Sequence, residues 1–333
     1  AYEMSCSLVG SEMCIRDSPC FRRRNHAELT GEYIRLSAER YGGMINDSWL
    51  DRPLSVAGRV VVRREGGLEA RLVDLKRDVA LIPRVAIHLN RETNSGVKYD
   101  PARDLVALYA AGTGSGSFYR EVARTADCAP EDVVAGDLVL YNNQPGTVWG
   151  PEGEFVSAPR LDDLACVFAC TEGFLTAQER DMVPVLCVFD NEEIGSETKQ
   201  GAASVFLPET LAAISEALGL SAADHRALLA DSMMLSCDNG HARHPNHPEL
   251  ADTNEAPVPN GGVVVKHSPR YATDGVSAAV FTELCRRAEV PVQHYANRPD
   301  QMGGATLGNI ADTKLPIPTV DIGMAQLAMH SCF

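Results

Sequence analysis

The sequence predicts an α/β fold with helices on both faces of a sheet, joined to a separate β-rich segment. From about residue 160 onward, short apolar runs alternate with longer stretches of helical periodicity, which is the pattern of strands and helices in alternation. Between residues 35 and 141 the apolar runs are short, and Gly, Pro, Asn and Asp separate them. A length of 333 residues suits two domains.

The β-rich segment contains a clear hairpin signal. Val60–Arg63 and Ala70–Val73 flank Glu65–Gly66–Gly67, a turn sequence between two runs rich in Val and Leu. Three more short apolar runs predict further strands: Val85–Leu89, Leu105–Ala110 and Leu138–Tyr141. These runs together indicate a β-rich domain of about a hundred residues.

The second part opens on an amphipathic helix. Its predicted buried face consists of apolar residues at helical spacing, with Asp162 and Asp163 at the helix start: Leu164, Val167, Phe168, Thr171, Phe174 and Leu175. Further strands are expected at Val183–Phe189, Met233–Cys237, Val263–Lys266, Pro291–Tyr295 and Thr319–Ile322. Further helices are expected at Leu207–Leu218, Ala222–Ala230 and Val276–Ala288.

Charge and composition exclude several classes of protein. The net charge of −15 repels phosphate backbones and anionic lipids, so we expect no nucleic-acid or membrane partner. Apolar runs such as Val183–Phe189 are far shorter than the roughly 18 residues of a membrane span. The ten cysteines lie scattered in apolar stretches without a CxxC pair, which is typical of reduced thiols in a cytoplasmic protein.

Both ends of the chain are unusual. Residues 1–18 have no signal-peptide pattern and no helical or strand periodicity, and residues 8–18 resemble translated sequencing-adapter read-through. We therefore expect residues 1–18 to be non-native, with a disordered native terminus as the alternative. The chain stops at Phe333, shortly after His330, and we expect it to be truncated there.

The strongest local signal for chemistry is Glu192–Glu193, in the sequence Phe189 to Ser196. The pair lies where a predicted buried strand ends and a helix begins, and ligands of open α/β sheets bind at that edge. One glutamate can bind a metal while its neighbour acts as a general base on a bound water. The alternative is a pair of solvated glutamates near a helix N-terminus.

Other candidate metal ligands also follow predicted sheet elements. Asp162 opens the first helix of this part, Asp238 follows the strand Met233–Cys237, and His330 follows the strand Thr319–Ile322. Each alone has an ordinary explanation, and for Asp162 it is a helix N-cap. Together, carboxylates and one imidazole suit zinc or a similar divalent ion.

Two further motifs carry less information. His241, His244 and His247 have a regular spacing, but no cysteine completes a zinc-finger pattern, so a separate structural zinc is disfavoured. Gly112 to Gly116 lacks the Lys-Ser/Thr of a phosphate-binding loop, and no helix clearly follows it. We interpret it as a flexible loop.

Taken in order along the chain, these motifs resemble aspartyl aminopeptidases, which are cytosolic zinc exopeptidases that remove N-terminal Asp or Glu. The resemblance runs from about Asp17 to Ser331. The matching segments are Ala86–Arg91, Pro159–Leu164, Phe189–Ser196, Ser236–Asp238 with His241–Asn246, Arg270–Thr273 and Met329–Ser331. It implies a zinc-exopeptidase-like sheet between helices, with an inserted β-rich dimerisation domain.

The resemblance also implies a ligand set for two zinc ions per subunit. Asp162 would bridge them, Glu193 and His330 would complete one site, and Asp238 would serve the other. Glu192 would be the general base.

One ligand of that set is missing from the sequence. The family has a histidine in a His-Thr-Asp-Ser-Pro motif, and Ile15 stands at that position in Ile15–Arg16–Asp17–Ser18–Pro19. Asp17 matches the aspartate that would orient the missing histidine. The suspected adapter sequence ends at this point, so an artefact explains Ile15 better than an evolved loss.

The remaining implications concern assembly and substrate. Residues 31–141 would be the inserted dimerisation domain, residues 1–30 the start of the catalytic domain, and residues 142–333 its remainder. His88 matches a histidine that would reach a neighbouring subunit's active site, and the resemblance implies a homo-oligomer built from dimers, such as a dodecamer. Lys266 and His241 would bind a peptide with an acidic N-terminal residue, whereas a surface lysine is the alternative for Lys266.

The sequence thus predicts a cytoplasmic, zinc-dependent aspartyl aminopeptidase. A related dinuclear metallohydrolase of other specificity, such as a glutamyl aminopeptidase or a deacylase, is the alternative within enzymes. A non-catalytic fragment that lacks one metal ligand is the alternative from another class.

Overall fold

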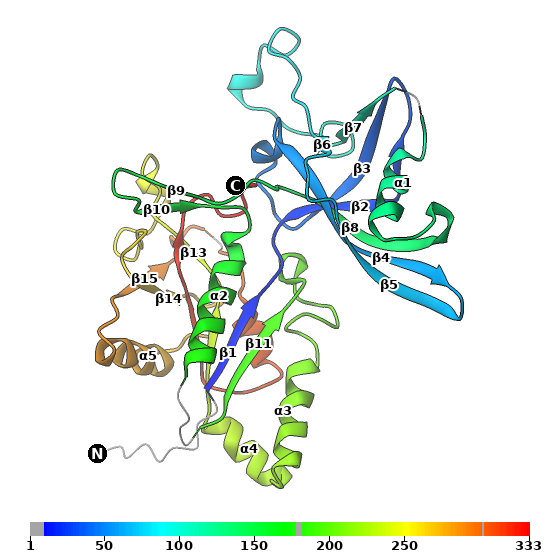
Figure 1. Cartoon of the computed structure of the whole chain (residues 1–333). Coiled ribbons are helices and arrows are strands. Elements are labelled where there is room, and N and C mark those ends of the chain that lie inside the picture. The colour runs from blue at the N-terminus through cyan, green and yellow to red at the C-terminus, as the bar shows by residue number, and fades with distance from the viewer. Residues whose placement is uncertain (1–9, 113, 178–181, 302) are drawn as a thin grey trace, which may run out of the picture. The chain divides into compact units, whose positions relative to one another are not determined.

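The computed structural model describes residues 10–112, 114–177, 182–301 and 303–333. The chain forms two compact units, residues 10–18 with 160–329 and residues 19–159 with 330–333 (Figure 1). The first is an α/β unit and the second is a β-rich unit. The predicted limits of 31 and 141 are too narrow for the β-rich unit, because β2 (Cys20–Leu29) pairs with two of its strands.

The α/β unit is built on a six-stranded sheet with the order β11-β1-β12-β16-β14-β15. Its strands are β1 (Gly10–Ile15), β11 (Pro184–Phe189), β12 (Met233–Cys237), β14 (Val263–His267), β15 (Val292–Ala296) and β16 (Thr319–Gly323). Neighbouring strands are parallel except β14 and β16. The predicted α/β fold is confirmed.

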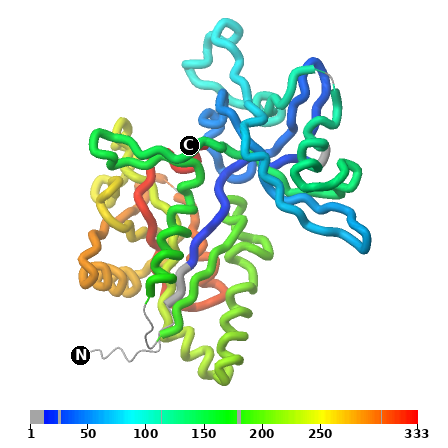
Figure 2. The backbone as a smooth tube through the Cα atoms, in the orientation of Figure 1, coloured from blue at the N-terminus to red at the C-terminus, as the bar shows by residue number. Residues whose placement is uncertain are grey.

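Residues 1–18 show no strand periodicity in sequence, yet residues 10–15 form a strand. Strand β1 lies between β11 and β12 and pairs with both in parallel. In Figure 2 its blue trace runs alongside the green trace of β11. Met13, Cys14 and Ile15 are buried there, so three consecutive apolar residues form a strand covered on both faces.

Helices cover both faces of this sheet. They are α2 (Leu161–Thr176), α3 (Phe206–Ala217), α4 (Ala222–Ala230), α5 (Gly275–Arg287) and α6 (Leu307–Asp312). Residues of α3, α4 and α6 pack in one apolar cluster with Met13 and Met234, and residues of α2 and α5 pack in a second cluster with Cys14 and Val265. Side chains of one strand alternate between the two clusters, as the pleat requires.

The predicted buried face of α2 is partly wrong. Cys166 and Cys170 are its buried apolar residues, whereas Phe168 is 68% exposed and Leu175 is 70% exposed. Asp162 and Asp163 have non-helical backbone angles, so the regular helix begins after them. The helical periodicity predicted the position of the helix correctly. The apolar side chains that it buries against the sheet are Cys166 and Cys170.

The β-rich unit has a seven-stranded sheet with the order β5-β4-β6-β7-β3-β2-β8. Its strands are β2 (Cys20–Leu29), β3 (Tyr33–Tyr41), β4 (Pro53–Arg64), β5 (Gly67–Asp74), β6 (Ala80–Leu81), β7 (Ala107–Ala111) and β8 (Val133–Tyr141). The predicted β4–β5 hairpin is confirmed, and β4 also pairs with β8, which closes the sheet on itself. The strand predicted at Val85–Leu89 is wrong, because turns occupy that segment.

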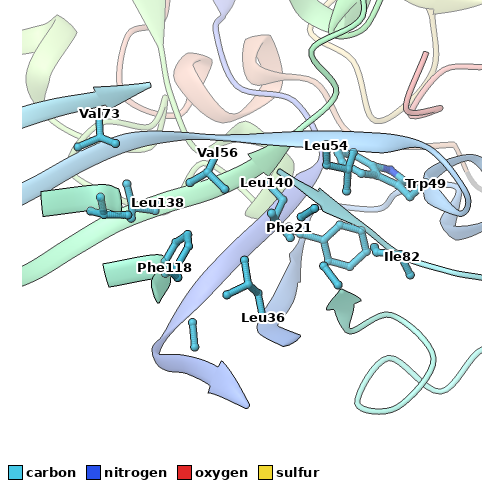
Figure 3. Packing of buried hydrophobic residues seen from close by; sticks show 14 of the residues in the cluster. Phe21, Leu36, Trp49, Leu54, Val56, Val73, Ile82, Phe118, Leu138 and Leu140 are labelled. Atoms are coloured by element: carbon cyan, nitrogen blue, oxygen red, sulfur yellow. The ribbon is translucent and has the colours of Figure 1, made fainter. Parts of the chain in front are cut away.

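The closed sheet surrounds its own apolar core. Figure 3 shows Phe21, Leu54, Leu138 and Leu140 pointing into this core, where Phe21 and Trp49 meet edge to face at 5.2 Å. Helix α1 (Ser117–Thr125) adds Phe118 to the core. This helix follows the glycine loop expected to be flexible, and the Glu28 carboxylate accepts hydrogen bonds from the Gly116 and Phe118 backbone N–H groups.

The remaining short strands form two small pairs. Strands β9 (Thr147–Trp149) and β10 (Phe155–Ser157) form a hairpin in the β-rich unit, and β13 (Gly240–His241) pairs with β17 (Ala325–Gln326) in the α/β unit. Within the described residues, no helix is both long and apolar enough to cross a membrane.

Candidate metal centre

Three neighbouring parallel strands bring the predicted site residues to one edge of the sheet. Strands β11, β1 and β12 lie side by side and end at Phe189, Ile15 and Cys237. Glu192, Asp17 and Asp238 follow these strand ends within the next few residues. Parallel strands present their carboxyl ends at the same edge, so residues far apart in sequence meet there.

A group of three carboxylates forms the centre of this site. Asp162, Asp163 and Asp238 each offer an oxygen within 4.8 Å of the others, and one oxygen of Glu193 is as close to Asp162. Asp162 and Asp163 are buried, and Asp238 is partly buried. The structure thus brings together three of the predicted ligands, Asp162, Glu193 and Asp238. It adds Asp163, for which neither spacing nor periodicity gave a signal.

These carboxylates are electrostatically costly without a cation. Burial raises the pKa of Asp163 well above its usual range, and the charges of Asp238 and Asp162 raise it further. Burial also raises the pKa of Asp238, although Lys266 opposes this shift. Asp163 Oδ1 is buried with no hydrogen-bond partner among the described residues. Hard oxygen donors this close together fit a divalent cation.

The two glutamates sit on a short turn held by Asp17. The Asp17 carboxylate accepts hydrogen bonds from the backbone N–H groups of Glu192 at 3.1 Å and Glu193 at 3.3 Å. Asn191, just before them, has a left-handed φ of 62°. Asp17 therefore fixes the turn that presents both side chains, a role that the sequence did not predict for it.

Glu192 lies in an environment that disfavours its charged form. Burial raises the pKa of Glu192 to about 8, and Asp238, Asp17 and Asp162 add to the shift. A carboxyl group with a pKa near neutrality can both take up and release a proton. The interpretation of Glu192 as a merely solvated glutamate does not fit this burial.

Lys266 is a buried cation, so its interpretation as a surface lysine is wrong. Its side chain is 2% exposed, and Nζ donates to Asp238 Oδ2 at 3.1 Å and to the Asn239 carbonyl at 3.3 Å. Nζ also lies 5.6 Å from the centre of the Tyr271 ring. Its predicted contact with substrate stays a prediction.

His241, His244 and His247 are not part of the carboxylate group. His241, at the end of β13, meets the Tyr295 ring edge to face at 6.1 Å. His244 and His247 are exposed, with ring centres 5.2 Å apart. These three histidines are not one of the metal-binding groups found among the described residues.

His330 and His88 both belong to the β-rich unit. His330 Nδ1 donates to the Gly43 carbonyl at 2.7 Å, and the Ile45 N–H donates to the His330 carbonyl at 3.0 Å. Because Nδ1 is the donor, the lone pair lies on Nε2, which is the arrangement common in metal-binding histidines. His88 is exposed on the turns that replace the predicted strand.

Ile15 occupies the position where the sequence predicts a missing histidine ligand. Met13 pairs with Ser236, and continuing this parallel register sets Ile15 beside Asp238. The Ile15 side chain packs in the apolar cluster with Phe189, while its N–H donates to Asp163 Oδ2 at 3.3 Å. The position is therefore next to the carboxylate group, but an aliphatic side chain fills it.

An α/β sheet with buried carboxylates at the carboxyl ends of its strands is suited to a metal-binding protein, and a metal held there can serve hydrolysis. The chain belongs to the M18 family of aminopeptidase I zinc metalloproteases, whose family model matches residues 5–333. The match includes residues 5–18 of the segment expected to be non-native, and that expectation stays a prediction. Membership makes the protein a zinc metallo-exopeptidase.

Similar proteins agree with this assignment. A probable M18 family aminopeptidase 2 of Clostridium acetobutylicum is 42% identical over 327 residues, which cover 95% of this chain and 75% of the relative. A protein of the same name from Mycobacterium leprae is 40% identical, with coverage of 95% and 75%. The mApe1 dodecamer of S. cerevisiae has a TM-score of 0.83 and 29% identity, covering 97% of this chain and 74% of its own.

Proposed function

We propose that this metallo-exopeptidase is an aspartyl aminopeptidase, which removes Asp or Glu from the N-terminus of peptides. The observation that carries the proposal is the buried group of Asp162, Asp163 and Asp238 with the Lys266 ammonium beside it. The carboxylates suit a metal, and the lysine is a cation suited to an acidic side chain.

The metal ligands of the proposal follow the family resemblance. Asp162 would be shared by two zinc ions, with Glu193 and His330 at one and Asp238 at the other. Bound zinc would supply Lewis acidity and lower the pKa of water. The distance of at most 4.8 Å between oxygens of Asp162 and Glu193, and between those of Asp162 and Asp238, supports the sharing of Asp162.

Glu192 is the proposed general base. It would take a proton from the attacking water, which the resemblance places between the metals, and deliver one to the leaving amine. The raised pKa of Glu192, about 8, supports this role because a higher pKa makes the carboxylate a stronger base. Asp17 supports it indirectly by holding the Glu192 backbone N–H.

Lys266 and His241 are the proposed contacts of the acidic substrate side chain. Lys266 Nζ already pairs with a carboxylate in the structure, that of Asp238 at 3.1 Å. A metal bound by Asp238 would weaken this pair and leave the ammonium for a substrate carboxylate. His241 lies three residues after Asp238 in sequence, at the end of β13.

We also propose a cytoplasmic homo-oligomer. The cysteines that the structure describes are all free thiols, which suits a reducing compartment. The dodecamer of mApe1 supports assembly of this chain from dimers, with a dodecamer as the proposed end state. In such an assembly His88 would reach a neighbouring subunit.

The test compares the release of N-terminal residues from peptides that begin with Asp, Glu, Ala or Leu, with zinc present. Because Ile15 replaces a proposed ligand, the assay uses the Ile15→His variant beside the unchanged chain. We expect Asp- and Glu-peptides to be cleaved at least about tenfold faster than the others, since a buried ammonium discriminates by more than 1.4 kcal/mol.

The control is Glu192→Gln in the same background. It should abolish turnover while the zinc content is retained, because it removes the base and not a ligand. Faster cleavage of Ala- or Leu-peptides would contradict the specificity. Loss of zinc equal to the loss of turnover would show that the roles of Glu192 and Glu193 are exchanged.

A further inference from the structure

Three polar residues share one face of the sheet beside the metal centre. Asp321 in β16 pairs with Ser236 in β12, and the antiparallel register of β14 and β16, continued by one residue, sets Lys266 opposite Asp321. Directly opposed residues point to the same face of a sheet. Asp321 and Ser236 are 0% exposed and Lys266 is 2% exposed, so this is a buried polar row.

Asp321 holds the segment that packs against Lys266. Its Oδ2 accepts a hydrogen bond from the Ala272 N–H at 2.6 Å, and its own backbone N–H donates to Thr273 Oγ1 at 2.8 Å. These two bonds fix residues 271–273, and the ring of Tyr271 lies 5.6 Å from Lys266 Nζ. Asp321 Oδ1 is buried and has no hydrogen-bond partner in the part of the chain that the structure describes.

The row gives Lys266 two anionic neighbours. One is Asp238, in direct contact at 3.1 Å, and the other is Asp321, on the adjacent strand. Lys266 is buried, and an ammonium buried without enough negative charge around it is costly, so both carboxylates stabilise its charge. If Asp238 were the only carboxylate near Lys266, the lysine would compete with any metal for Asp238. Asp321 balances part of the Lys266 charge and so reduces this competition.

We propose that Asp321 is a positioning residue of the metal centre, which supplies the second counter-charge of Lys266 and so leaves Asp238 available to a divalent cation. The inference rests on the proposed function of Asp238 as a metal ligand. It assigns a role to a carboxylate that touches neither the metal group nor a predicted substrate position.

The test is a double-mutant cycle of Asp321→Asn and Lys266→Met. The measured quantity is the zinc affinity of the full chain, determined by calorimetric titration with zinc and no peptide. Asp321→Asn keeps an oxygen that can accept from the Ala272 N–H but removes the charge. We expect it to weaken zinc binding at the proposed site of Asp238 about tenfold, since Lys266 then depends on Asp238 alone. In a Lys266→Met background the same change should cost less than about twofold, because no cation competes.

Controls separate this charge effect from a structural one. Asp312→Asn removes an exposed carboxylate on α6 and should change the zinc affinity less than about twofold. Hydrogen exchange of residues 271–273 should be unchanged in Asp321→Asn. If Lys266→Met does not fold, Lys266→Gln replaces it.

Two outcomes would overturn the proposal: an unchanged zinc affinity in Asp321→Asn, or an equal loss with and without Lys266. The readout does not depend on peptidase activity. The expected zinc affinities could therefore be found in a protein that does not cleave acidic peptides. That result would overturn the proposed specificity and not the role of Asp321.

Discussion

A single side chain, Ile15, decides how completely the metal centre can be built. It stands beside Asp238 in the continued β1–β12 register, and its N–H already donates to Asp163. An isoleucine has no lone pair, so the proposed site at Asp238 has only carboxylate ligands from the chain. We therefore expect the unchanged chain to bind one zinc ion tightly and a second one weakly.

Ile15→His should raise the zinc content from about one toward two per chain and increase the rate on Asp-peptides by about 100-fold or more, as Lewis-acid stabilisation contributes several kcal/mol. Metal analysis and initial rates measure both effects. Ile15→Leu is the matched control and should change neither, because leucine fills the apolar cluster without a lone pair. Two tightly bound zinc ions with Ile15 in place would contradict the ligand assignment.

At the scale of residues, the sequence predicted site residues that lie at the ends of predicted elements. It did not predict those whose role depends on how the elements pack. Asp162, Glu193 and Asp238 could be found because they follow strand ends or open a helix, and the structure brings them together. Asp163 and Asp321 could not, because a buried carboxylate inside a helix start or a strand has no periodic signature. Lys266 was found, but its burial against Asp238 depends on the β14–β16 pairing.

At the scale of elements, helix α6 approaches the polar row closely because Gly308 has no Cβ. A Cβ at this position would lie 2.7 Å from Ser236 Oγ and 2.8 Å from Asp321 Oδ1. Real contacts of a Cβ are longer than this, so one of the elements would have to shift. The glycine thus lets α6 seal the sheet face that carries Asp321.

We expect Gly308→Ala to lower the free energy of unfolding by ~1–3 kcal/mol, as overpacking of a tight core does. Gly275→Ala is the matched control, because Gly275 begins α5 and nothing lies within 4 Å of its added Cβ. That change should be neutral or slightly stabilising. Urea denaturation of both variants measures the difference, and equal midpoints would show that α6 moves away without cost.

Elements with strong periodicity could be predicted, and those defined by their partners could not. Helix α4 and strand β12 have the predicted limits, Ala222–Ala230 and Met233–Cys237. Strand β1 shows no alternation at Met13–Ile15, where successive side chains are buried on opposite faces, so only its pairing with β11 and β12 identifies it. The run Val85–Leu89 has strand-like composition, but it forms turns on the surface.

At the scale of the whole molecule, the exposed apolar residues around His88 favour assembly. Leu89 is 83% exposed, Val85 56% and Ile87 44%, all within one short segment of the β-rich unit. Grouped exposed apolar side chains of this kind commonly mark an interaction surface. They support the proposal that this segment contacts a second copy and brings His88 to its active site.

If His88 serves a neighbouring subunit, two inactive variants should complement each other. In a chain that carries Ile15→His, we expect His88→Ala to cut activity without releasing zinc, and Glu193→Ala to abolish activity because a proposed ligand is lost. A mixed dimer holds one site with intact ligands, and the Glu193→Ala partner supplies the missing histidine to that site. Random mixing makes half of the dimers hybrid, each with one working site of two, so about a quarter of the full activity should return. The activity of unmixed and remixed samples measures this, with hybrids verified by mass spectrometry. No recovery in verified hybrids would show that each subunit completes its own site.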